Sequence, residues 1–217
     1  MTLNLTLEIF LRSMGFTLLV TGVSFLLAAV LGVAVAAARR SSNSLLSGLA
    51  AVWITILRGV PPLVWLFIVY FGVTVGGAKF TPISAAVITF GVVGSAYLAE
   101  AYRAGLDAVP KSQREALAAL SVPRWAAMRL VILPQAFPVI ISTCASYGIH
   151  LLKDTALASL IGVQEMTYLA NDIVQRGTDG FTAFFLLGLA YLALSIPVGL
   201  LARAVAGRSQ RGKVRFA

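Results

Sequence analysis

The sequence predicts an all-α integral membrane protein with about five transmembrane helices, its N-terminus outside the cell and its C-terminus inside. Three observations support this: 59% of the 217 residues are hydrophobic, only 12% are charged, and Lys and Arg outnumber Asp and Glu by 17 to 8. In an ordinary globular chain about a quarter of the residues are charged. This chain lacks the charge that a water-exposed surface needs, and a lipid environment explains the deficit.

Five stretches of the chain are apolar enough to cross a membrane. The longest, from Ser13 to Ala38, contains no Asp, Glu, Lys or Arg. Each stretch has roughly 20 residues, the length at which a helix crosses the hydrocarbon core. We therefore predict a single transmembrane domain over residues 1–217. Its spans are expected at about residues 14–38, 53–75, 81–102, 130–152 and 181–203.

The second span is predicted to be bent. A run from Ser41 to Leu57 leads into it without a turn, and its polar start suggests a cytoplasmic approach segment at the membrane interface. Arg58-Gly59 and two prolines follow, and each proline removes a backbone donor and clashes with the preceding turn. Bent helices in membranes tend to line cavities, so the break is expected to shape a translocation path. A simple kink is the alternative.

The basic residues set the orientation of the spans. Twelve Lys and Arg follow the first, third and fifth spans, four lie on the opposite side, and Arg58 is left unassigned. Because cytoplasmic loops carry the excess of basic residues, the side with twelve faces the cytoplasm. The same placement between apolar runs argues against nucleic acid as a partner, which would need a clustered basic face.

The chain has few of the residue types that catalysis or metal binding requires. Cys144 and His150 are the single cysteine and histidine, so neither a thiolate metal site nor a hydrolytic triad can be built, and no catalytic or metal residue is expected. The tail from Gly207 to Val214 has the spacing of a phosphate-binding loop, but Val214 replaces the Ser or Thr that would hold Mg²⁺. We expect no cofactor here and a basic tail near anionic lipid.

The largest cytoplasmic loop, residues 103–129, contains the most informative pattern. Ser112 and Glu115 have the spacing of a capping box, which predicts a short helix that begins at Ser112 and stops near Ser121-Val122-Pro123. A second helix is expected to begin near Pro123 and lead into the fourth span. A compact helix projecting into the cytoplasm can dock into a groove of a partner. An amphipathic loop lying on the lipid is the alternative.

This loop resembles the signature of ABC-importer permease subunits, Glu-Ala-Ala, three residues, Gly, nine residues, Ile-x-Leu-Pro. Here Leu117, Ser121 and Val131 replace the second Ala, the Gly and the Ile. The polar-amino-acid class of these permeases is similar over about residues 15–203. The segments that carry this second resemblance are 58–61, 70–72, 109–116, 133–136 and 152–163.

The resemblance implies a type I ABC-importer permease fold in the bacterial inner membrane and transport of a polar amino acid. It implies as partners a second permease subunit, identical or homologous, two cytoplasmic ATPase subunits that would bind ATP and Mg²⁺, an extracytoplasmic solute-binding protein, and membrane lipid. The loop helix would be the coupling helix seated in the ATPase. Its expected ATPase-coupling residues are Glu115, Ala116, Leu117, Ser121, Val122, Pro123 and Arg124.

Ionisable groups at membrane depth are functional by default, and they supply the candidates for a substrate path. These are Glu165, Glu100, Asp154, Lys153 and Arg58. Glu165 is favoured, because residues 160–170 form a half-apolar segment predicted to be a helix that dips back between spans. Two alternatives stay open: Lys153 and Asp154 neutralise each other, and Glu100 pairs with Arg103 at helical spacing.

A stand-alone secondary transporter or channel is the competing function. Five spans without a strong internal repeat are unfavourable for a single-chain carrier, and the loop signature would have no role in it. A membrane-embedded enzyme is disfavoured, because neither a metal cluster nor a nucleophile–base pair is visible. Binding of ATPase subunits would separate the importer from both.

Overall fold

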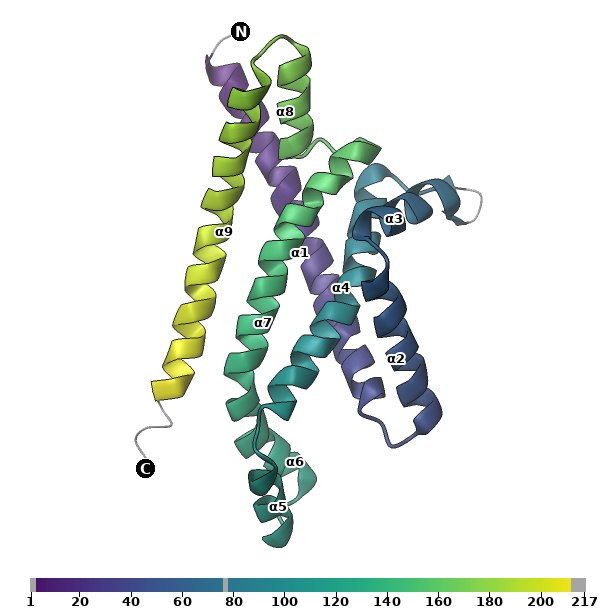
Figure 1. Ribbon diagram of the computed structural model, residues 1–217, viewed down its shortest axis with the longest axis vertical. Coiled ribbons are helices and arrows are strands. Elements are labelled where there is room, and N and C mark those ends of the chain that lie inside the picture. Colours follow the sequence, from purple (N-terminus) through teal and green to yellow (C-terminus); the bar gives the residue numbers. More distant parts are fainter. Residues whose placement is uncertain (1–2, 76–77, 212–217) are drawn as a thin grey trace.

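The protein is a bundle of long helices with short elements at both ends (Figure 1). The computed structural model describes residues 3–75 and 78–211, so Val214 and the end of the basic tail lie outside it. The elements are α1 (Leu3–Arg39), α2 (Ser44–Gly59), α3 (Pro62–Phe67), the π-helix η1 (Ile68–Gly72), β1 (Thr74–Val75), β2 (Ala78–Lys79), α4 (Pro82–Asp107), α5 (Lys111–Ala119), α6 (Arg124–Ala126), the π-helix η2 (Ala127–Ile132), α7 (Leu133–Asp154), the 3-10 helix η3 (Thr155–Ile161), α8 (Met166–Gln175) and α9 (Gly180–Arg211). The two strands form a minimal antiparallel pair, with Thr74 opposite Lys79.

Four helical stretches are each long and apolar enough to span a membrane. They are Leu11–Arg39, Pro82–Asp107, Arg124–Ile161 and Gly180–Leu201. They include most or all of the predicted spans at 14–38, 81–102, 130–152 and 181–203. The start of α1 lies at one end of the bundle, and α5 and the end of α9 lie at the other (Figure 1). This arrangement is the one that the basic residues predict for an N-terminus outside and a C-terminus inside.

The fifth candidate span is sharply bent. α2 and the α3–η1 segment meet at 99°, because Val60 takes an extended conformation before Pro61 (φ −109°, ψ 134°) and a residue that precedes proline is driven out of the helical region. The helical span also begins earlier than the predicted residue 53. The Asn43 side chain accepts hydrogen bonds from the amides of Leu45 and Leu46, which starts α2 at Ser44.

The 41–57 run, expected as a cytoplasmic approach segment, forms most of the α2 helix. Ala50, Ile54 and Leu57 are buried against the neighbouring helices, and α2 runs beside α1 and α4 (Figure 1). One face of α2 therefore packs on the bundle, whereas Leu45, Leu49 and Val52 are exposed apolar residues on the rest of its surface. The segment that lies across the bundle axis is α3 with η1, after the bend.

α4 is the central helix, and small residues let its neighbours approach it closely. Ala96 and Ala99 are fully buried where α4 meets α1 and α2. A Cβ atom at Gly94 would lie 2.7 Å from the Ala28 Cβ atom and 2.5 Å from the Tyr147 hydroxyl. In lipid, helices associate through this kind of close van der Waals packing between small residues. The position of α4 places one of its faces between α2 and α7, where a cavity forms.

Candidate functional site: a projecting helix and a charged cavity

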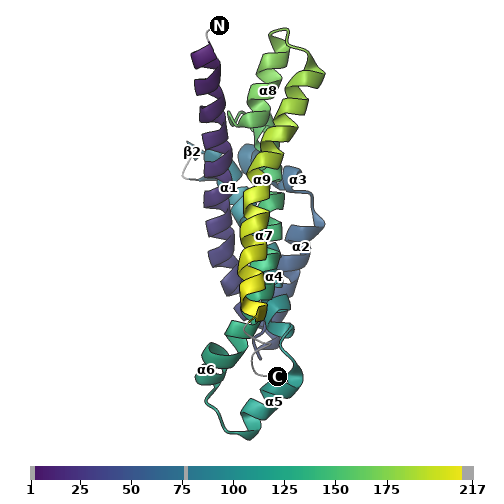
Figure 2. The same ribbon diagram turned by 90° about the vertical axis from the view of Figure 1, so that its left-hand side faces the viewer.

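The α5 helix projects beyond the ends of the long helices, together with α6 (Figure 2). It begins at Lys111, one residue earlier than predicted, and the capping box was wrong. Pro110 is the N-cap residue, and no side chain caps this end of the helix. Pro110 has ψ of 140°, outside the helical region, and its ring fixes φ at −54°. Ser112 therefore already lies inside the helix, where its hydroxyl is not the cap and Glu115 cannot complete the box.

The α5 helix ends in a tight turn at Ser121. This residue has a left-handed backbone, with φ of +52°. The amide of Val122 donates to the carbonyl of Leu117 and that of Ser121 donates to Ala118, both at 3.0 Å, which is the hydrogen-bond pattern of a Schellman C-cap. The left-handed position is the one that favours glycine. The turn therefore forms even though serine replaces the glycine of the permease signature.

The projecting helix is free on most of its surface. None of its residues is buried. Five of the seven predicted coupling residues are exposed, and Leu117 and Val122 are half-buried. Two large apolar side chains beside them are also exposed, Leu120 at 76% and Trp125 at 68%. Sequence reasoning did not select these two as site residues, although an apolar side chain in a cytoplasmic loop is the signal that would have found them.

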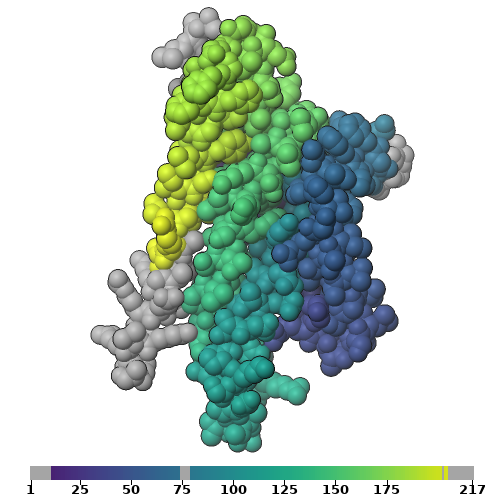
Figure 3. Space-filling model, viewed as in Figure 1, coloured from purple at the N-terminus to yellow at the C-terminus, as the bar shows by residue number. Residues whose placement is uncertain are grey.

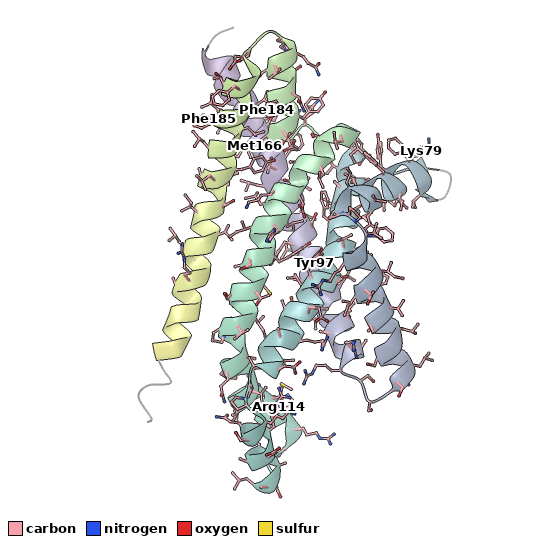
Figure 4. All side chains as sticks on the ribbon, in the orientation of Figure 1. Lys79, Tyr97, Arg114, Met166, Phe184 and Phe185 are labelled. Carbon is pink, nitrogen blue, oxygen red and sulfur yellow. The ribbon has the colours of Figure 1, made fainter. Side chains whose placement is uncertain are left out.

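A cavity of about 590 Å³ opens between the α2–α3 bend, α4 and α7. Its lining residues are Arg58, Pro62, Phe90, Val93, Tyr97, Glu100, Ala101, Ala104, Thr143, Ser146, Tyr147, His150 and Asp154. On the face shown in Figure 3, α4 lies between α7 and α2. Tyr97 is seen in the same region in Figure 4. The cavity is open on one side, where Arg58, Thr143, Ser146 and His150 are exposed, and its lining residues lie along the candidate spans.

Charged and aromatic groups line the cavity together. The Arg58 guanidinium lies 5.1 Å from the centroid of the Tyr97 ring, a cation–π distance. Tyr97 stacks on Tyr147 with ring centroids 5.2 Å apart. Glu100, Asp154 and His150 complete the polar lining. Such a cavity offers donors for a carboxylate and acceptors for an ammonium group, held between aromatic walls.

Three of the five predicted path residues meet at this cavity: Arg58, Glu100 and Asp154. Lys153 is exposed on α7 and is not among the lining residues, and no ion pair joins its ammonium to Asp154 within the described chain. The pairing of Glu100 with Arg103 is confirmed, with 2.6 Å between carboxylate oxygen and guanidinium nitrogen. Glu100 therefore faces the cavity with part of its charge already neutralised.

Glu165 lies elsewhere, fully buried where α8 meets α1 and α9. The predicted helix over 160–170 is interrupted, because Gly162 takes a left-handed backbone (φ +93°) that ends η3, and the α8 helix begins only at Met166. The Glu165 carboxylate caps α8 by accepting from the Tyr168 amide at 2.8 Å. Burial raises the pKa of this carboxyl, and the hydrogen bonds that it accepts oppose that shift. It does not line the cavity.

The described residues contain no group of three His, Cys, Asp or Glu side chains that could hold a metal ion. Cys144 is a buried free thiol on α7.

The described residues form four long apolar helices and a bent fifth, with a charged cavity between α2, α3, α4 and α7 and a small helix projecting at one end, which is the architecture of a helical membrane subunit. The family model for the binding-protein-dependent transport system inner membrane component matches residues 28–211, and the chain belongs to this family. It is a multi-pass protein of the inner membrane and a transport component, not an enzyme in its own right.

Curated relatives and solved structures agree with this assignment. The probable amino-acid ABC transporter permease protein YckA of Bacillus subtilis (strain 168) is 37% identical over 184 residues, which cover 85% of this chain and 81% of that protein. The L-cystine transport system permease protein TcyL of the same organism is 30% identical over 207 residues, which cover 92% of this chain and 87% of that protein.

Among solved structures, one chain from a crystal structure of an amino acid ABC transporter with histidines has a TM-score of 0.87 and 29% identity, over 96% of this chain and 100% of that one. A chain of the inward-facing MetNI methionine ABC transporter has a TM-score of 0.81 at 18% identity, over 96% of this chain and 99% of that one. The second likeness concerns the fold alone.

Proposed function

We propose that this chain is the permease subunit of an ATP-driven importer, which moves a polar amino acid that an extracytoplasmic binding protein delivers. The observation that carries the proposal is the joint presence of a charged cavity among the spans and an exposed helix at the cytoplasmic end. Membership in the binding-protein-dependent family supports it. So do the names of the relatives, which are amino-acid and L-cystine permeases.

The partners follow from the same proposal. A second permease subunit, identical or homologous, completes the membrane part, and two cytoplasmic ATPase subunits bind ATP and Mg²⁺. The α5 helix docks in a groove of one ATPase subunit, with Glu115, Ala116 and the turn at Ser121 in the contact. The exposed Leu120 and Trp125 side chains supply apolar surface for this interface, where buried aromatic anchors commonly carry much of the binding energy.

The cavity chemistry fits a zwitterionic substrate. The Arg58 guanidinium has five donors in a planar fork and suits a carboxylate. Asp154 offers an acceptor for the ammonium group, and Tyr97 and Tyr147 wall the space between them. Charges at membrane depth are costly unless they are paired. A bound amino acid would pair both signs at once, which favours this class of ligand over an uncharged solute.

ATP drives transport by shifting a conformational equilibrium. Closure of the ATPase subunits displaces α5, and the long helices reorient between an outward-open and an inward-open state. Each state exposes the cavity to one side of the membrane. This chain contributes the cavity and the α5 helix, and the ATPase subunits hydrolyse ATP.

The test is reconstitution in lipid nanodiscs with the candidate ATPase and binding proteins, with a panel of glutamine, cystine, histidine and methionine. We expect one loaded binding protein to stimulate ATP hydrolysis, and uptake of the same amino acid in proteoliposomes. Ala116→Trp should abolish uptake by blocking the docked helix. Leu160→Trp is the matched control, since Leu160 is 59% exposed near the opposite end of the bundle. Failure of every ATPase to bind the wild-type chain would overturn the proposal.

A further inference from the structure

We propose that Gln113 and Arg114 are positioning residues that make α5 move as one body with both walls of the cavity. The inference rests on the proposed function, in which an ATPase displaces α5. The two residues are adjacent in the chain, yet they hold different long helices. Gln113 contacts α7 and Arg114 contacts the end of α4, and α4 and α7 supply most of the cavity lining.

The contact to α7 is a hydrogen bond between side-chain amides. Gln135 donates to the Gln113 side-chain oxygen at 2.6 Å and also to the carbonyl of Val131 at 3.0 Å. Gln135 lies in the first turn of α7, the same helix that carries the cavity residues Thr143, Tyr147 and Asp154 beyond an internal proline, Pro138. A displacement of α5 that carries Gln113 therefore acts on the inner end of a helix that lines the cavity.

The contact to α4 involves both charge and backbone. The Arg114 guanidinium donates to the carbonyl of Leu106, in the last turn of α4. It also lies 3.9 Å from the Asp107 carboxylate. That carboxylate pairs with Arg40 just beyond the end of α1, at 2.6 Å. Cations at a helix C-terminus interact favourably with the helix dipole, so Arg114 secures α5 to the end of α4 and, through Asp107, to α1. Arg114 lies at the junction between the α5–α6 projection and the long helices (Figure 4).

These contacts add little to the stability of the fold. The side chains of Arg114, Asp107 and Arg40 are 32%, 51% and 34% exposed, and partly exposed ion pairs add little to stability because water screens them. The connection between α4 and α5 is only three residues, 108–110, and is backed by Pro110. Short backbone and side-chain contacts together leave α5 little freedom to swing independently. A displacement of α5 is therefore transmitted to α4 and α7, and through these helices to the cavity.

The decisive measurement is the number of ATP molecules hydrolysed per amino acid taken up, in proteoliposomes that contain the full complex. For the Gln113→Ala, Arg114→Ala double variant we expect the complex to assemble and still to hydrolyse ATP, so that the ratio can be measured. The ratio of ATP hydrolysed to substrate moved should rise about fivefold or more, the factor that corresponds to losing roughly 1 kcal/mol of contact energy. Lys111→Ala with Ser112→Ala is the matched control, because both residues are exposed on the same helix.

A rescue separates transmission from a merely structural role. Gln113→Glu combined with Gln135→Lys replaces the amide contact by an ion pair. Its ratio should return toward wild type from the value of Gln113→Ala alone, with a restoration that weakens at high salt. If the double alanine variant fails to fold, the single variants Gln113→Ala and Arg114→Ala test the two contacts one at a time. A wild-type ratio in folded alanine variants overturns this inference. Loss of ATPase binding by the wild-type chain would instead overturn the proposed function.

Discussion

The Tyr191 hydroxyl donates a 2.7 Å hydrogen bond to the Glu165 carboxylate, which joins α9 to the start of α8. The amide of the next residue, Met166, donates to the hydroxyl of Thr17 on α1 at 3.3 Å. Three helices are thus held at one buried point, and the carboxylate is fully buried there. A buried polar group stabilises a fold only when its hydrogen bonds are satisfied, as they are for both Glu165 oxygens.

Replacing Glu165 by leucine should destabilise the outer end of the bundle. The change removes the side-chain N-cap of α8 and leaves the Tyr191 hydroxyl with only the Thr167 hydroxyl as a partner, at a cost of about 1–3 kcal/mol. Glu165→Gln keeps an acceptor for the Tyr168 amide and should cost less. Thermal unfolding in detergent measures both. Equal midpoints for Glu165→Leu and wild type would contradict the assigned role of the carboxylate.

Replacing Ser121 by glycine should stabilise the C-cap of α5. Serine in a left-handed backbone is strained, and removing the Cβ atom should gain about 1 kcal/mol. Ser121→Val should lose stability, because a β-branched residue tolerates this backbone poorly. Limited proteolysis of the 103–129 loop reports local opening. The glycine variant should resist cleavage longer than wild type, and the reverse order would show that the turn is not left-handed in solution.

Adding a methyl group at Gly94 should disrupt the contact between α1, α4 and α7. The new Cβ atom would lie 2.5 Å from the Tyr147 hydroxyl and 2.7 Å from the Ala28 Cβ atom, so helices must separate, and overpacking of this kind costs about 1–3 kcal/mol. Gly22→Ala is the matched control, since nothing lies within 4 Å of a Cβ atom there. That variant should be neutral or stabilised by about 0.5–1 kcal/mol, because alanine favours the helix. A higher midpoint of thermal unfolding for Gly94→Ala than for Gly22→Ala would contradict close packing of α1, α4 and α7 at Gly94.

Replacing Arg58 by alanine should weaken substrate recognition in the cavity. Loss of a hydrogen bond to a charged group costs about 1.5–3 kcal/mol, which predicts a rise in the KM of uptake of tenfold or more. Arg58→Lys should recover only part of this, since lysine lacks the planar fork. Arg12→Ala is the control, because Arg12 also lies over an aromatic ring, that of Phe16, outside the cavity. An unchanged KM in Arg58→Ala would remove Arg58 from the substrate path.

Much of the fold follows from local features of the sequence. The uninterrupted apolar stretches predict the spans of α1, α4, α7 and α9, because the length of an apolar run decides whether a helix crosses lipid. The break after Arg58 was also predictable, since Pro61 acts on its own neighbours. The start of α5 was not, because two short-range signals competed at its N-terminus: the Ser112–Glu115 spacing and the backbone of Pro110. In the structure Pro110 is the N-cap residue, and the helix begins at Lys111.

The sequence by itself therefore determined the class of fold, the orientation and the projecting loop helix, all of which depend on residues within a few positions of one another. Only the tertiary structure decided which ionisable groups share a cavity. Arg58, Glu100 and Asp154 converge there. The Glu165 carboxylate instead accepts hydrogen bonds from the Tyr191 hydroxyl and the Tyr168 amide. Ionisable side chains in lipid must find a partner, and which partner they find depends on the packing of helices that lie far apart in the chain.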